Sequence, residues 1–187
     1  MEIEIKKGTW RYVILLPFLG IAIKLPRIYL TEAWDVIIFT LGCKGWWRIE
    51  LFKNDVYTYS SLKGWLFKGM VNNWLEYKFY IQTKHPFCVP TYLSLLGLIN
   101  IQRLVTISQF DDLDLGYQLK LILGKADVHH WGNPSNFTFE TGRLQILDYG
   151  DPEVQAAIRK YGQKIQDNFD PNYSWEKRKR ELEEARR

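Results

Sequence analysis

Asp148 lies in the segment LDYGD at residues 147–151, directly after an apolar, strand-like stretch. A carboxylate at the end of a strand can hold a metal ion, because functional groups are commonly placed where a rigid element ends. Asp and Gly are also the residues that turns prefer, so the same segment is compatible with a simple turn. The segment alone leaves both interpretations open, and the elements that would position Asp148 must decide between them.

Short strands and helices follow one another in a pattern that predicts an α+β fold. Charged and apolar residues alternate in the first segment, as in a half-buried strand, and tight turns separate it from two further strands. Apolar residues near helical spacing predict the helices, and Gly97 separates two strands. We predict strands at 2–6, 10–17 and 21–28, a helix at 64–83, two strands within 89–105, a helix at 111–123, a hairpin of NFTF and GRLQILD, and helices at 152–166 and 174–187.

Two segments of this pattern carry more specific expectations. The middle strand, 10–17, is apolar enough to be buried on both faces. Residues 31–62 are predicted to be an insertion that opens with a helix at Thr31 and is broken by Gly42 and Gly45.

Composition restricts the class of protein. The chain has 187 residues, a hydrophobic fraction of 47% and a net charge of +4 with both signs mixed along it, so nucleic acid is not an expected partner. Its 2 Cys lie outside any CxxC pattern, which excludes a cysteine zinc site and favours a reducing cytoplasm. The longest apolar run, 12–23, is shorter than the roughly 20 residues of a membrane span, and no signal peptide is predicted. We expect a cytoplasmic protein without a membrane partner.

Four segments together resemble the protein-kinase-like fold: IAIK with Lys24, NNWLEY with Glu76, DVHHWGNPSN at 127–136, and LDYGD with Asp148. The resemblance implies that Lys24 contacts nucleotide phosphates and that Glu76 on a helix pairs with it. It further implies that Asp127 accepts the proton of the acceptor substrate, while Asn136 and Asp148 hold magnesium. ATP and Mg²⁺ would be the cofactors of an active enzyme.

The proposed metal pair is compatible with simple chain geometry. Magnesium takes hard oxygen ligands and few of them from protein, so one carboxylate and one amide oxygen suffice. Asn136 precedes Asp148 by twelve residues, the length of a hairpin that brings its two ends side by side. Asp127 lies nine residues before Asn136, more than such loops usually have, so either residues are inserted or Asn133 is the equivalent position.

Departures from the family favour a pseudokinase that binds a protein partner over an active kinase. Only KKGTW, with Gly8, stands where a glycine-rich loop should cover the phosphates. Fewer than forty residues follow Asp148, too few for the usual large helical lobe. The expected organisation is a kinase-like N-lobe at 1–105 with its insertion at about 31–62, a reduced C-lobe at 106–170, and a charged helical tail at 171–187. Such a trimmed protein would suit a phage, which would place it in the host cytoplasm or the virion.

A metal-dependent nuclease is the alternative from another class. DVHHWGNPSN also resembles the first part of an HNH motif, in which His129, His130 and a following Asn frame a metal ion. That motif requires a later His or Asn on a helix, and no His follows His130. The N-terminal strands would also have no role in it.

Overall fold

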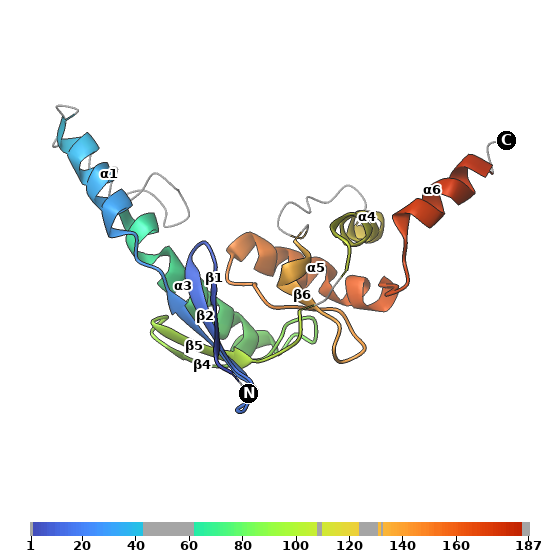
Figure 1. Ribbon diagram of the computed structural model, residues 1–187, viewed down its shortest axis with the longest axis horizontal. Helices are drawn as coiled ribbons and strands as arrows, with labels where there is room; N and C mark the ends of the chain where they lie inside the picture. Colours follow the sequence, from blue (N-terminus) through green and yellow to red (C-terminus); the bar gives the residue numbers. More distant parts are fainter. Residues whose placement is uncertain (1, 43–61, 108–109, 124–130, 132, 185–187) are drawn as a thin grey trace. The chain divides into compact units, whose positions relative to one another are not determined.

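The computed structural model describes residues 2–42, 62–107, 110–123, 131 and 133–184. Within them the fold is α+β, with a five-stranded antiparallel sheet, a two-stranded hairpin and five α-helices (Figure 1). The chain divides into two units, Met1–Lys84 with Pro90–Leu104 and His85–Val89 with Val105–Arg187. Residues 85–89, which the sequence assigned to the first lobe, thus group with the second unit, because they pair with the hairpin there.

The first unit is built on the five-stranded sheet. Its strands are β1 (Glu4–Lys7), β2 (Arg11–Leu16), β3 (Ile21–Pro26), β4 (Thr91–Leu95) and β5 (Ile99–Arg103), in the order β1-β2-β3-β5-β4. β2 to β5 lie within the corresponding predicted segments, and β1 extends one residue beyond the predicted 2–6, to Lys7. Gly20 and Gly97 adopt φ values of +63° and +78° in the turns that follow β2 and β4, a conformation that glycine adopts without steric cost. The glycine positions in the sequence therefore identified both turns.

Helix α3 (Leu62–Thr83) precedes β4 in the chain and packs on β3, β4 and β5 (Figure 1). Two glycines permit this close approach. A Cβ on Gly69 would lie 2.4 Å from the carbonyl oxygen of Trp10, and a Cβ on Gly97 would lie 2.1 Å from that of Met70. The helix is therefore fitted to the sheet by backbone contact near the β1–β2 turn and the β4–β5 turn.

The prediction that the strand at 10–17 is buried on both faces is wrong. In β2 only Arg11 is buried, and Tyr12 is 39% exposed. The reason is that α3 packs on the face of the sheet toward which Arg11 points, so Tyr12, the next residue along the strand, points to the opposite face. Apolar composition indicated a buried strand but could not show which face the helix covers.

The predicted insertion is described only at its beginning. Helix α1 (Leu30–Gly42) starts next to the predicted Thr31, ends at the predicted break, and packs against α3. Gly45 and the rest of the insertion up to residue 61 lie outside the described residues.

The second unit contains α4 (Asp112–Leu123), the hairpin β6 (Phe137–Thr138) and β7 (Gln145–Ile146), α5 (Pro152–Asn168) and α6 (Trp175–Glu184). A parallel bridge joins Cys88 to Ile146 and adds the 85–89 segment to the hairpin. The rings of Phe87 and Trp131 stack with centroids 5.5 Å apart, and both side chains are buried. The charged tail predicted at 171–187 is helical in α6, and Trp175 attaches it to α4 by stacking on Tyr117 at 4.0 Å.

Among the described residues, no helix combines the length and the apolar character that crossing a bilayer requires.

Candidate functional site

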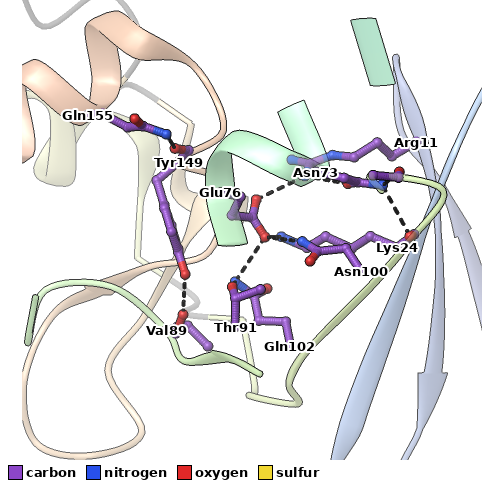
Figure 2. A network of polar contacts seen from close by, with 11 residues as sticks. Arg11, Lys24, Asn73, Glu76, Val89, Thr91, Asn100, Gln102, Tyr149 and Gln155 are labelled. Carbon is purple, nitrogen blue, oxygen red and sulfur yellow. Dashed lines mark hydrogen bonds and ion pairs between the residues drawn. The ribbon is translucent and has the colours of Figure 1, made fainter. Parts of the chain in front are cut away.

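Lys24 and Glu76 form the ion pair that the sequence predicted. The Lys24 ammonium donates to Glu76 Oε1 at 2.7 Å, from β3 to α3 (Figure 2). Alternation along β3 explains the geometry, because Ala22 and Lys24 are buried toward the helix while Ile23 points to the other face. The side chain of Lys24 is 6% exposed and that of Glu76 is fully buried. The prediction that these two residues face one another from a strand and a helix is confirmed.

The Glu76 carboxylate accepts more hydrogen bonds than this one. Arg11 donates to Oε2 at 2.9 Å, and the amides of Asn100 and Gln102 donate to Oε1 at 3.0 and 3.4 Å (Figure 2). All five side chains are buried. We refer to Arg11, Lys24, Glu76, Asn100 and Gln102 as the Glu76 cluster; it neutralises and hydrogen-bonds a carboxylate that would otherwise be very costly to bury.

Asn73, one helical turn before Glu76, connects the same face of α3 to the backbone of the sheet. Its amide oxygen accepts from Arg11 at 3.1 Å. Its amide nitrogen donates to the carbonyl oxygens of Lys24 at 3.2 Å and Gly97 at 2.9 Å. These bonds, from one fully buried side chain, fix the position of α3 along the sheet.

The sequence did not predict a role for Arg11, Asn73, Asn100 or Gln102. A signal for two of them was present, since Asn100 and Gln102 are two residues apart in the strand INIQR and must share a face. Their alternation with isoleucines indicates one polar and one apolar face. What the pattern does not indicate is that the polar face is the covered one.

The turn between β1 and β2 is short and internally bonded. Gly8 N–H donates to the carbonyl oxygen of Arg11 at 2.9 Å, which closes a tight hairpin. Arg27 donates to the carbonyl oxygens of Gly8 and Thr9 at 2.7 and 3.2 Å, and the hydroxyl of Tyr29 also donates to that of Thr9. The β1–β2 turn is therefore held by its own backbone hydrogen bond and by the side chains of Arg27 and Tyr29.

The second unit contains the predicted Asn136 and Asp148. The carbonyl oxygen of Asn136 accepts from the N–H of Leu147 at 2.8 Å, next to the pair Phe137–Ile146. The hairpin therefore brings Asn136 beside the residue that precedes Asp148, as the twelve-residue spacing predicted. Asn136 is half-buried and Asp148 is exposed, so both side chains can be reached from solvent.

Asn133, the alternative to Asn136, has a structural role. Its side-chain oxygen accepts from the N–H of Ser135 at 3.0 Å and from the Ser135 hydroxyl at 2.6 Å, at the start of the short helix Pro134–Asn136. An amide oxygen engaged as a helix cap is less suited to a metal ion. Asn136 is therefore the better candidate of the two.

Backbone and side-chain contacts hold the residues that follow Asp148. Residues 148–150 belong to no helix, strand or turn. The Tyr149 ring is fully buried, its hydroxyl donates to the carbonyl oxygen of Val89 at 2.6 Å, and its own carbonyl accepts from Gln155 at 2.9 Å (Figure 2). Asp151 then caps α5 by accepting from the N–H of Glu153 at 2.8 Å. The acidic residue that serves as a cap is thus Asp151.

Asp127, His129 and His130 lie outside the described residues, so the structure provides no geometry for the catalytic base or for the nuclease motif. In the described part of the chain, no group of three or more His, Cys, Asp or Glu side chains could hold a metal ion. The predicted magnesium pair is smaller than such a group, with one Asp and one Asn.

Comparison with known proteins identifies no relative: no family model matches the chain, and neither does any curated protein or solved structure.

Proposed function

We propose that this protein is a kinase-like scaffold, a pseudokinase in which the Lys24–Glu76 pair stabilises the fold and the protein works by binding a protein partner. Support for the kinase-like class comes from the order of elements: three strands with a lysine on the third, then α1, and further along the chain α3 with a glutamate paired to that lysine. Protein kinases require this Lys–Glu pair. A strand hairpin ending in Asp-Tyr-Gly follows in the second unit.

The observation that carries the scaffold function is the burial of Lys24. To contact a phosphate, a lysine must present its ammonium to the ligand, yet the Lys24 side chain is only 6% exposed. The tight β1–β2 turn supports the same conclusion, because the Gly8 N–H is used within the turn. Phosphate-binding loops instead point free backbone N–H groups at the ligand.

An active kinase is the second candidate, and one observation favours it. Asp148 is exposed and Asn136 lies beside the residue before it, which is compatible with a shared magnesium ion. In that case Asp127 would accept the proton of the substrate hydroxyl, and ATP with Mg²⁺ would be required.

Thermal unfolding with a non-hydrolysable ATP analogue, with and without Mg²⁺, tests the proposal. A ligand at hundredfold excess over its dissociation constant stabilises by about 2.7 kcal/mol. For a chain of this size that corresponds to a rise of roughly 5–10 °C in Tm. We expect no rise in the wild type.

The control variant is Asp148→Asn, an exposed change expected to alter stability by less than about 0.5 kcal/mol. A magnesium-dependent rise in the wild type that is lost in Asp148→Asn would refute the scaffold function and support the active kinase. A rise that persists in the variant would also refute it, because the protein would then bind nucleotide without that metal ligand.

A further inference from the structure

The face of the five-stranded sheet opposite α3 is aliphatic from edge to edge. The strand registers place one residue of each strand in a single row across it: Ile5, Ile14, Ile23, Ile101 and Leu93. Ile23 lies between the buried Ala22 and Lys24, so this row points away from the helix. We refer to this side of the sheet as the outer face.

The sheet has the reverse of the usual polarity. An antiparallel sheet with one covered face normally places apolar residues under the cover and polar residues in water. Here the covered face carries Lys24, Asn100 and Gln102, while Ile5 and Leu93 on the outer face are 65% and 51% exposed. An apolar surface that spans a whole sheet is characteristic of an interaction site.

Charge is confined to two positions of the outer face. Of the paired strand residues on that side, only Lys7 and Arg103 are charged, and none is acidic. Lys7 is in the row of Tyr12 and Leu25, whereas Arg103 is opposite Ile21 at the other end of the strands. Two cations at opposite ends do not make the basic rim that an anionic lipid surface would require.

From this pattern we infer that the outer face binds the outer face of a second copy of this chain. A two-fold axis in the plane of the interface, along β3 or across it, places aliphatic rows on aliphatic rows. In either arrangement Lys7 and Arg103 of one copy stay apart from those of the other. Packing of two sheets through their apolar faces, about 10 Å apart, is a standard architecture. The inference does not depend on the proposed function.

The size of the face determines the strength of this contact. Five strands about 4.8 Å apart make the face roughly 24 Å wide. About five residues per strand, at about 3.3 Å per residue, make it roughly 18 Å long, so the face covers about 430 Å² in projection. Two faces provide about 860 Å² in projection, and more as accessible surface. Specific interfaces bury about 1,200–2,000 Å², and the projected area of about 860 Å² lies below that range. The dimer should therefore be weak and should form in a concentration-dependent way.

Sedimentation equilibrium of the whole protein, from about 1 µM to about 1 mM, covers the dissociation constants of such interfaces. The face variant combines Ile5→Lys with Leu93→Lys, two exposed positions where folding should tolerate the change. The matched control is Leu121→Lys, an equally apolar residue that is 63% exposed on α4 of the other unit. Circular dichroism checks that all three proteins are folded.

We expect the average mass of the wild type and of Leu121→Lys to rise from 22.2 kDa toward twice that value. The face variant should show a dissociation constant at least tenfold higher. A wild type that keeps the mass of one chain throughout would overturn the inference, as would equal association of the face variant and the control. Binding of a single-chain wild type to phosphatidylserine vesicles would also overturn it and would assign the face to lipid.

Discussion

The Glu76 cluster makes a quantitative prediction about the substitution Glu76→Gln. This change keeps the shape of the side chain and removes its negative charge. Arg11 donates to Oε2, while Lys24 and the two amides donate to Oε1. Whichever oxygen becomes the amide nitrogen, at least one buried donor then faces another donor. Two buried cations would also lose their shared carboxylate.

The expected cost follows from that loss. Removing one partner of a buried ion pair typically destabilises by about 3–5 kcal/mol, because the remaining charge stays buried and uncompensated. Domains unfold with only about 5–15 kcal/mol, so Glu76→Gln should consume a large part of the stability of the first unit. Lys24→Met should cost less than about 2 kcal/mol, since Glu76 keeps Arg11 and two amides while a costly desolvated ammonium is removed.

Hydrogen exchange followed by mass spectrometry measures the loss of stability of the first unit. Peptides from that unit report its opening free energy separately from the opening of the second unit. Glu4→Gln is the control: Glu4 pairs with Lys6 at 3.6 Å in the same sheet, but both side chains are exposed, so the change should cost less than about 1 kcal/mol. The expected order of destabilisation is Glu76→Gln, then Lys24→Met, then Glu4→Gln. A Lys24→Met variant as unstable as Glu76→Gln, or a Glu76→Gln variant as stable as the control, would refute this account of the cluster.

Two further predictions concern a turn and a histidine. Gly97→Ala should destabilise the protein by about 1–3 kcal/mol more than Gly20→Ala, as measured by urea unfolding. Both glycines have a positive φ, but only a Cβ at Gly97 would meet the backbone of Met70. Equal losses of stability in the two variants would contradict this. Burial, and then the Arg159 guanidinium, lower the pKa of His85 below its ordinary 6.5. As the pH falls through 6.5, the unfolded chain therefore binds more protons at His85 than the folded chain does. The free energy of unfolding should consequently decrease below that pH. His85→Gln should weaken that decrease in urea titrations across this range, and an unchanged slope would contradict the assignment.

Local chemistry in the sequence predicted most of the elements. Turn glycines such as Gly20 and Gly97, the change from strand to helical periodicity near Lys63, and the spacing of Asn136 and Asp148 all act over short distances. Each constrains the backbone directly, so the corresponding turns, helix and hairpin are found in the structure. The pairing of Lys24 with Glu76 was expected only from the resemblance, since no local rule links residues 52 positions apart.

The composition of the Glu76 cluster was not predictable in the same way. Arg11 reads as an ordinary residue at the start of a strand, and its role arises because α3 lies over that part of the sheet. The same limit explains the error on β2, whose apolar residues gave no indication of which face the helix would cover. The role of Arg11 and the burial of β2 both depend on tertiary contacts with α3, whereas the sequence patterns describe only the alternation of side chains within a strand.

A polar covered face has a consequence that an apolar one would not. An apolar face would hold α3 by contacts that tolerate small shifts of the helix, because burial is not directional. Hydrogen bonds from Asn73 to the carbonyl oxygens of Lys24 and Gly97, together with the four donors on Glu76, can form at one position of the helix only. Asn73 and the Glu76 cluster therefore fix the position of α3 on the sheet, as the scaffold function proposed above requires.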